Sequence, residues 1–250
     1  MSEVTKVALV TGGTGGVGQA TSNKLHAMGY KVYATDIKAP GEDSELTQGI
    51  EYRQHDVASE SDWAALMADI DQAHGRLDVL VNNAAILMAL TLEEQSLESF
   101  KRIFDVNCSS VFLGMKHALP LLRASGAGSI INMSSSSGIQ GYHLFAAYGA
   151  TKAAVRNLTQ STAVYCHAND YPVRCNSVHP DGILSNMVAN MAEGTLPEMD
   201  EQQGLKAFKF ACMPDAVADV ICFLAGEGAR HINGAAICVD NSSTIQMPYF

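Results

Sequence analysis

The sequence predicts an α/β protein, a doubly wound parallel sheet with helices on both faces, in three layers. Short apolar runs with high β propensity alternate along the chain with segments of helical periodicity. This alternation is typical of parallel strands joined by crossover helices. The chain has 250 residues and contains no linker rich in Pro, Gly and Ser, so we expect a single domain over residues 1–250.

The expected strands are short and rich in Val, Ile and Ala, and they cover residues 7–10, 31–36, 78–84, 129–134, 173–180 and 235–240. The expected helices carry apolar residues three and four positions apart, and they cover residues 17–28, 62–73, 97–122, 147–168 and 215–226. A Met-rich segment at 185–210 breaks the alternation, because Gly194, Pro197 and Gly204 interrupt it. Irregular segments of this length are usually functional, so we expect a substrate lid there.

The composition restricts the class of partner. The formal net charge is -10, and there is no cluster of Lys and Arg of the kind that binds nucleic acid or an anionic membrane. No apolar run is long enough to cross a bilayer, and the first residues do not form a secretory signal. The six cysteines lack metal-ligand spacing with the histidines, so no metal is expected. We expect a cytoplasmic protein that acts on small molecules.

A glycine-rich turn directly follows the first expected strand, in the sequence VALVTGGTGGVGQ. Glycine permits a tight turn and lets a pyrophosphate approach the backbone N–H groups at the start of a helix, where the helix dipole favours an anion. A strand before the turn and a helix after it are the context that this motif requires. We therefore predict dinucleotide binding by Gly12, Thr14, Gly16, Val17 and Gly18.

Asp36 closes the second expected strand, KVYATD, about twenty residues after the glycine turn. Its carboxylate can accept hydrogen bonds from the ribose hydroxyls of an adenosine, and it would repel a 2′-phosphate. The glycine segment carries no Lys or Arg, and Lys38 is the nearest basic residue after Asp36. The expected cofactor is therefore NAD(H) rather than NADP(H).

Tyr148 and Lys152 lie four residues apart in an expected helix, so they share one helical face. An ammonium group near a phenol stabilises the phenolate and lowers a pKa that is ordinarily about 10. A phenol with its pKa near the working pH is an effective general acid or base. The pair is expected to transfer a proton beside the bound dinucleotide.

Taken together, these motifs resemble the short-chain dehydrogenase/reductase family, and the resemblance extends over nearly the whole chain. The positions that carry it are TGGTGGVG at 11–18, Asp36, Asp56 with Val57, NNAA at 82–85, Asn107, the serine run at 134–137, YGATK at 148–152 and HPDGILS at 179–185. The resemblance implies a Rossmann-like sheet and a homotetramer.

The family's catalytic residues correspond to four positions of this sequence. The resemblance implies that Tyr148 is the general acid/base, that Lys152 lowers its pKa and holds the nicotinamide ribose, and that Asn107 supports a water-linked proton relay. The family's substrate-binding serine lies thirteen residues before the tyrosine and three before a glycine, which selects Ser135. The other serines of the run are then polar residues at a strand end, although Ser136 can also face the pocket.

The resemblance also implies further cofactor contacts, at Ile37, Asp56, Val57, Asn83, Pro180, Ile183 and Ser185. The sequence departs from the family pattern at Ala85, where a glycine is usual, and around Ser185, which replaces the usual threonine. Tyr142 is interpreted as a wall of the substrate pocket, and Met187 of the expected lid as a second substrate contact.

These features predict reversible hydride transfer between NAD(H) and a secondary alcohol or ketone. The HPDGI segment is similar to that of bacterial 3β/17β-hydroxysteroid and cyclic-alcohol dehydrogenases, and apolar residues are frequent at 185–210, so a hydrophobic substrate is expected. One alternative is a 3-oxoacyl thioester reductase, against which Asp36 and the acidic composition argue. The other is a dinucleotide-sensing protein without turnover, which has no need of an activated phenol.

Overall fold

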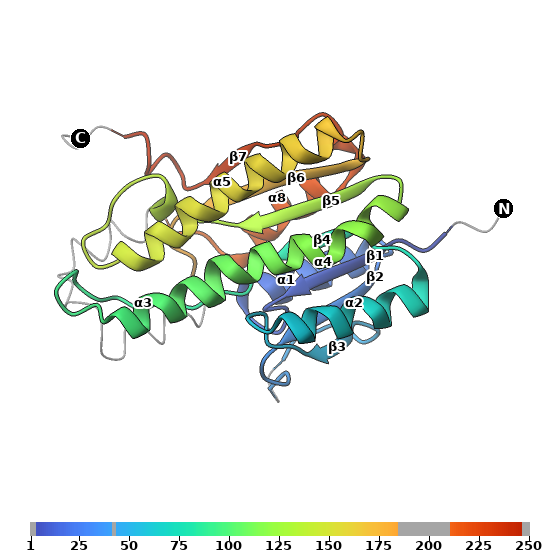
Figure 1. Ribbon diagram of the computed structural model, residues 1–250, viewed down its shortest axis with the longest axis horizontal. Helices are drawn as coiled ribbons and strands as arrows, with labels where there is room; N and C mark the ends of the chain where they lie inside the picture. Colours follow the sequence, from blue (N-terminus) through green and yellow to red (C-terminus); the bar gives the residue numbers. More distant parts are fainter. Residues whose placement is uncertain (1–3, 42–43, 185–210, 247–250) are drawn as a thin grey trace.

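The computed structural model describes residues 4–41, 44–184 and 211–246. In this part of the chain seven parallel strands form one sheet, in the order β3-β2-β1-β4-β5-β6-β7 (Figure 1). The strands are β1 Val7–Thr11, β2 Lys31–Asp36, β3 Glu51–Gln54, β4 Val79–Asn82, β5 Gly128–Met133, β6 Val173–Pro180 and β7 Ala236–Val239. The predicted doubly wound parallel sheet is confirmed.

Helices cover both faces of the sheet and make the three expected layers (Figure 1). On one face lie α2 Glu60–His74, α4 Ser110–Ala124 and α5 Ala146–Ala168, where Trp63, Leu122 and Val155 are fully buried against the strands. On the other face lie α1 Gly16–Ala27 and α8 Pro214–Ala225, with Leu25 and Ile221 fully buried. Burial of these side chains is the main force that holds the layers together.

The strand order reverses at β1, whose neighbours are β2 on one side and β4 on the other. The connections that leave β1 and β4 therefore run to opposite faces of the sheet. This separation opens a crevice beyond the carboxyl ends of the two strands, which is where parallel α/β sheets bind ligands.

Two elements differ from the expectation. The edge strand β3 has the polar sequence EYRQ, which lacks the apolar pattern of a buried strand, and Glu51 in it forms an ion pair with Lys31 of β2 at 2.8 Å. The single helix expected over 97–122 consists of α3 Leu97–Phe104, a short π-helix at Asp105–Ser109, and α4.

The segment expected to be a lid, 185–210, lies outside the described residues. In the described part of the chain, no helix has the length and apolar character required to cross a membrane.

Candidate active site

A cavity of about 430 Å³ opens at the carboxyl edge of the sheet and brings most of the predicted site residues together. Its lining includes Gly12, Thr14, Gly16, Val17, Asp36, Ile37, Asp56, Val57, Asn83, Ser135, Tyr148, Lys152, Pro180 and Ile183. Three other predicted residues, Gly18, Asn107 and Tyr142, are not part of this lining. Ser185 and Met187 lie outside the described residues.

The glycine turn fits the phosphates of a dinucleotide. The backbone of Gly12 and Gly16 has φ values of 60° and 48°, a conformation that favours glycine. Helix α1 begins at Gly16 and directs its N-terminal N–H groups toward the cavity end of β1. A Cβ on Gly18 would lie 1.9 Å from the carbonyl oxygen of Gly12, so Gly18 allows the close approach of α1 to the turn rather than lining the cavity.

Asn83 fixes the glycine turn from the neighbouring strand. Its side-chain amide donates hydrogen bonds to the carbonyl oxygens of Thr11 at 3.0 Å and Gly12 at 3.1 Å. The Thr11 hydroxyl in turn accepts from the backbone N–H of Asn83 at 3.0 Å and of Ala84 at 3.1 Å. These bonds couple β1 to the segment after β4, so both sides of the crevice form one rigid unit. Ala85, the departure noted in the sequence, also lines the cavity.

Asp36 occupies the end of β2 with its carboxylate already oriented. Oδ2 accepts a hydrogen bond from the Thr14 hydroxyl at 2.8 Å, and Oδ1 accepts from the backbone N–H of Ile37 at 2.8 Å. Each carboxylate oxygen retains a further lone pair for a ligand hydroxyl. This geometry suits two neighbouring hydroxyl groups of a ribose.

His55 is a buried residue of the same cavity that the sequence reasoning missed. Its Nδ1 lies 3.2 Å from the Thr35 hydroxyl, and its Nε2 has no hydrogen-bond partner among the described residues. Burial lowers the pKa of the His55 imidazole to about 4, so the ring is neutral at neutral pH. Its position directly before Asp56 was the only available signal in the sequence.

Ser135 and Tyr148 meet at the cavity wall. The Ser135 hydroxyl oxygen accepts a hydrogen bond from the backbone N–H of Ser137 at 3.1 Å, which leaves the hydroxyl proton free to be donated. Hydrogen bonding to Ser135 lowers the pKa of the Tyr148 phenol, but burial has the larger and opposite effect. The net result raises the pKa of Tyr148 to about 12.

Lys152 lies next to Tyr148 but does not produce the expected pKa. Its side chain is almost completely buried, and Nζ donates to the carbonyl oxygen of Met133 at 2.8 Å and lies 5.4 Å from the centre of the Tyr148 ring. Burial lowers the pKa of Lys152 itself to about 8. The expectation that Lys152 brings the phenol pKa below its ordinary value is therefore wrong for the chain alone, because desolvation of the phenol dominates.

Asn107 is fully buried in the π-helix and holds a cavity-lining segment in place. Its side chain accepts from the backbone N–H of Ile86 and donates to the carbonyl oxygen of Ile86, both at 2.8 Å. Ile86 itself lines the cavity. π-Helices occur often at functional sites, and this one positions a single asparagine at a helix interior where its propensity is low.

The remaining serines of the run and Tyr142 have separate partners. The Ser134 hydroxyl donates to the carbonyl oxygen of Lys152 at 2.8 Å, which attaches the start of α5 to β5. The Ser136 hydroxyl donates to Asp181 at 3.0 Å. The Tyr142 hydroxyl is also directed at Asp181, at 3.4 Å. Asp181 lines the cavity, and the sequence reasoning did not include it among the site residues.

His179 holds Ser135 from behind. It is fully buried, its Nδ1 lies 3.1 Å from the carbonyl oxygen of Ser135, and its Nε2 lies 2.9 Å from the Ser177 hydroxyl. A carbonyl oxygen only accepts, so Nδ1 must carry the proton and Nε2 must accept from Ser177. Burial lowers the pKa of His179, which keeps this neutral tautomer.

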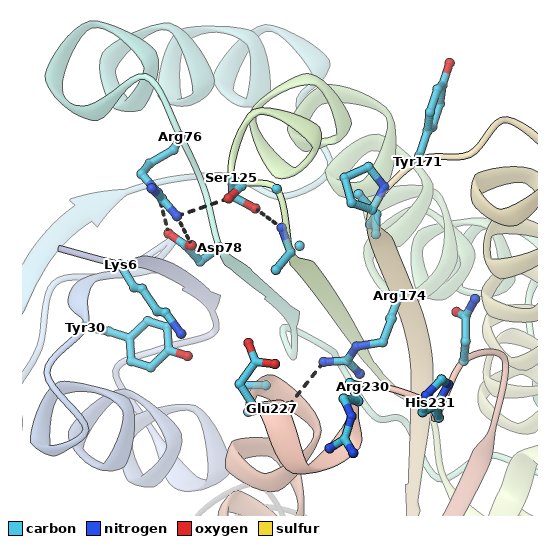
Figure 2. Close-up of a pocket in the computed structure, with 18 of the residues that line it drawn as sticks. Lys6, Tyr30, Arg76, Asp78, Ser125, Tyr171, Arg174, Glu227, Arg230 and His231 are labelled. Atoms are coloured by element: carbon cyan, nitrogen blue, oxygen red, sulfur yellow. Dashed lines mark hydrogen bonds and ion pairs between the residues drawn. The ribbon is translucent and has the colours of Figure 1, made fainter. Parts of the chain in front are cut away.

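A second hollow, of about 530 Å³, lies at the opposite, amino edge of the sheet (Figure 2). Two of its arginines already have partners: Arg76 binds the Asp78 carboxylate at 2.6 Å and the carbonyl oxygen of Ser125 at 3.2 Å. Arg174 donates to the carbonyl oxygens of Leu224 at 2.8 Å and Ile232 at 3.3 Å. These bonds satisfy the carboxyl ends of helices, where cations are favourable. The predicted catalytic residues lie instead in the cavity at the carboxyl edge.

No group of His, Cys, Asp and Glu that could hold a metal ion occurs among the residues of known placement.

The fold and the carboxyl-edge cavity define a nicotinamide-dinucleotide oxidoreductase with a Rossmann-type sheet. Residues 12–243 match the family model adh_short_C2, described as "Enoyl-(Acyl carrier protein) reductase". The chain belongs to the short-chain dehydrogenase/reductase family.

Similar known proteins are named as dehydrogenases of a hydroxysteroid, an alcohol and an aldohexose. The 3-beta-hydroxysteroid dehydrogenase of Comamonas testosteroni is 40% identical over 242 residues, with 95% of each chain covered. The NADP-dependent (R)-specific alcohol dehydrogenase of Lentilactobacillus kefiri is 35% identical over 247 residues, with 96% of this chain and 97% of the relative covered. The solved structure of aldohexose dehydrogenase from Thermoplasma acidophilum has a TM-score of 0.85 at 30% identity and covers 98% of this chain and 96% of its own. The chain is accordingly an oxidoreductase that transfers a hydride between an alcohol and a ketone.

Proposed function

We propose that the chain is an NAD(H)-dependent dehydrogenase of a hydrophobic secondary alcohol, such as a hydroxysteroid or a cyclic alcohol. The observation that carries this proposal is that one cavity contains Ser135, Tyr148 and Lys152 together with the glycine turn and Asp36. A proton-transfer group and a dinucleotide cradle in one cavity are the two parts that hydride transfer to or from an alcohol requires.

Tyr148 is the proposed general acid/base. In alcohol oxidation its phenolate takes the proton of the substrate hydroxyl, and in ketone reduction its phenol returns that proton. Ser135 donates its free hydroxyl proton to the substrate oxygen and so fixes the position of that oxygen. The Lys152 ammonium stabilises the phenolate by its charge, and its two remaining N–H donors are available to a ribose. The bound dinucleotide supplies the hydride acceptor or donor.

The predicted dinucleotide is NAD(H). The Asp36 carboxylate is held by Thr14 and by the backbone of Ile37, where a 2′-phosphate would meet its negative charge. Lys38 is not among the residues that line the cavity, and the Lys and Arg residues in its described lining are Lys152 and Arg102. The relative from Lentilactobacillus kefiri is NADP-dependent, so the cofactor is a property to be tested on this chain.

The substrate assignment rests on apolar lining and on the hydroxysteroid relative. Ile86, Val106, Met133 and Ile183 contribute apolar surface to the cavity. The Comamonas testosteroni relative acts on a 3-beta-hydroxysteroid by its name. A bulky alicyclic alcohol is the substrate class that joins these two observations.

The single-domain organisation, the homotetramer and the cytoplasmic location are further parts of the proposal. Large apolar side chains are exposed on α4 and α5, at Phe112 and Val164, and such residues suit contacts between subunits. The six cysteines are free thiols, as is usual in a reducing compartment. Light scattering on the purified protein measures the subunit number directly.

The first experiment follows NADH formation with steroid, cyclic and short aliphatic secondary alcohols. Tyr148→Phe keeps the shape of the residue and removes the proton-transfer group, so we expect kcat/KM to fall by roughly a thousandfold or more. Tyr165→Phe, an exposed tyrosine on the same helix, is the matched control and should retain full activity. Near-complete activity in Tyr148→Phe would contradict the proposed mechanism.

The second experiment compares NAD with NADP for the same alcohol. We expect kcat/KM to favour NAD, and Asp36→Asn to reduce that preference by roughly tenfold, because the repulsion of the 2′-phosphate is lost. A wild-type preference for NADP would overturn the cofactor assignment while leaving the role of Tyr148 intact.

A further inference from the structure

Asp181 is an acidic residue of the cavity that contains the proposed reaction centre. It directly follows Pro180, the last residue of β6, and lines the same cavity as Ser135 and Tyr148. A carboxylate only accepts hydrogen bonds when ionised. The Ser136 hydroxyl at 3.0 Å and the Tyr142 hydroxyl at 3.4 Å therefore donate to Oδ1 of Asp181.

Neutral groups hold this carboxylate in place. Ser136 is nearly completely buried, and Tyr142 is itself fixed by the Gln140 side-chain amide, which donates to the Tyr142 hydroxyl at 2.6 Å. The phenol of Tyr142 thus bonds to Asp181 and Gln140, and Tyr142 does not line the cavity. Hydroxyl donors orient a carboxylate without neutralising its charge.

None of the ion pairs in the described part of the chain involves Asp181. The cationic side chains of the described cavity lining are Lys152 and Arg102. Lys152 is buried and directs Nζ at the carbonyl oxygen of Met133, and Arg102 is exposed on α3. Among the described residues the Asp181 carboxylate therefore has no cationic partner, so its negative charge is available to act on a ligand in the cavity.

We propose that Asp181 is a specificity-determining residue that excludes substrates with a carboxylate or phosphate group and so restricts the enzyme to uncharged alcohols and ketones. The inference rests on the proposed function and names a limit on its substrate class. Two unit charges about 7 Å apart, at the effective dielectric constant of about 20 that suits partly buried sites, repel strongly enough to change binding by roughly ten- to a hundredfold. Acyl thioesters attached to an acidic carrier protein are disfavoured as substrates on the same ground.

The test compares two substrates that differ in one charged group, cyclohexanol and trans-4-hydroxycyclohexanecarboxylate. We expect wild-type kcat/KM to favour cyclohexanol, and Asp181→Asn to shift the ratio toward the carboxylate by at least tenfold. Asparagine retains an oxygen that accepts from Ser136 and Tyr142, so the local structure has the same hydrogen bonds. Asp71→Asn removes the same charge from the exposed surface of α2 and should leave the ratio unchanged.

A second variant separates charge from geometry. Ser136→Ala removes one hydrogen bond to Asp181 but keeps its charge, so discrimination against the carboxylate should persist. An equal shift in Ser136→Ala and Asp181→Asn would overturn the proposal, because it would show that the position of the side chain matters and not its charge. An unchanged ratio in Asp181→Asn would overturn it as well.

Binding measurements test the inference independently of turnover. Calorimetry with cyclohexanecarboxylate and its neutral isostere cyclohexanecarboxamide, in the presence of NADH, should show weaker binding of the carboxylate to the wild type and a smaller difference in Asp181→Asn. Added salt should also reduce the wild-type difference, because it screens the repulsion. Wild-type protein that distinguishes the two ligands but oxidises no alcohol would refute the proposed function alone, and equal binding of the two ligands would refute the role of Asp181 alone.

Discussion

Ser135 owes its position to a histidine that never reaches the cavity surface. His179 donates through Nδ1 to the Ser135 carbonyl and accepts through Nε2 from Ser177, so a neutral ring connects β6 to the end of β5. Ser177 is held further by its backbone N–H, which donates to the carbonyl oxygen of Ala235 at 2.9 Å. Ser135, the proposed substrate-binding serine, is thus fixed from its backbone side.

Substitution of His179 should affect the rate of reaction more than the binding of substrate. His179→Leu removes the imidazole donor of the Ser135 carbonyl, which keeps the backbone N–H of Gly138 as a donor, and it removes the imidazole acceptor of the Ser177 hydroxyl. With Ser135 held less firmly, we expect kcat to fall by roughly tenfold with little change in KM. His179→Asn places an amide donor near the position of Nδ1, so it should recover part of the lost rate. Steady-state kinetics with one fixed alcohol measures both effects. Equal loss in the two variants would show that the ring matters for packing only.

The proton affinities of Tyr148 and Lys152 predict different pH profiles for the two directions of the reaction. Because burial raises the pKa of Tyr148 to about 12, the phenol is protonated at neutral pH, which is the form needed to reduce a ketone. Oxidation needs the phenolate, so kcat/KM for the alcohol should rise by about tenfold per pH unit from neutral pH. The rise should flatten above pH 8, since Lys152, with its pKa lowered to about 8, loses its charge there.

Initial rates in both directions between pH 6 and pH 10 check this prediction. The reduction profile should stay flat where the oxidation profile rises. Identical profiles in the two directions would mean that Tyr148 does not control the proton in either.

The turn between β1 and α1 depends on glycines that are close in sequence but differ in their surroundings. A Cβ on Gly18 would lie 1.9 Å from the Gly12 carbonyl oxygen and 2.7 Å from the side-chain nitrogen of Asn83, whereas a Cβ on Gly15 would meet no atom within 4 Å. Displacement of α1 would disturb both the turn and its bonds to Asn83.

Gly18→Ala should therefore lower the free energy of unfolding by roughly 2 kcal/mol or more and weaken NADH binding by at least tenfold. Gly15→Ala is the matched control for stability and should change the free energy of unfolding by less than about 0.5 kcal/mol. Urea unfolding and NADH fluorescence titration give the two quantities. A Gly18→Ala protein as stable as the wild type would contradict the close packing of α1.

Elements with a strong local pattern could be predicted from the sequence, and those fixed by distant partners could not. The strand–glycine–helix unit and the Tyr148–Lys152 pair are encoded in contiguous residues, so their positions followed from spacing. Strand β3 is polar and exists because β2 offers it a free edge. Asp181 bonds to a serine 45 positions away, and the pKa of Tyr148 depends on burial. Neither the Asp181–Ser136 hydrogen bond nor the burial of Tyr148 can be predicted from the local periodicity of the sequence.

In the molecule as a whole, the candidate active site and a set of stabilising hydrogen bonds lie at opposite edges of the sheet. The cavity lies at the carboxyl edge of the sheet, and at the amino edge Arg76 and Arg174 bond to the carboxyl-terminal ends of α4 and α8. Asp78 takes part in the hydrogen bonds at the amino edge, since it accepts from Arg76 and from the backbone N–H of Val7 at the start of β1. Changes at the amino edge should act on stability and leave catalysis unaffected.

Arg174→Met tests this separation. The variant retains the apolar length of the side chain and removes the Arg174 hydrogen bonds to the carbonyl oxygens of Leu224 and Ile232. These oxygens keep the Ser129 hydroxyl and the Asn176 amide as donors, so we expect a loss of about 1 kcal/mol and a melting temperature lower by about 3 °C. Arg230→Met is the control, because Arg230 is exposed and forms no ion pair among the described residues. Both variants should keep wild-type kcat and KM, measured well below the melting temperature. A large kinetic defect in Arg174→Met would show that the two edges are coupled.

Because all the strands run in the same direction, the candidate active site and the amino-edge hollow lie on opposite sides of the molecule, which is useful for immobilising the protein. Ala127 is exposed in the loop that leads into β5 and borders the amino-edge hollow, far along the sheet from the ends of the strands that carry the site. An Ala127→Cys variant that also carries Cys238→Ser, and so lacks the exposed native thiol, would present its substrate entrance to the solution when attached to a solid support through residue 127.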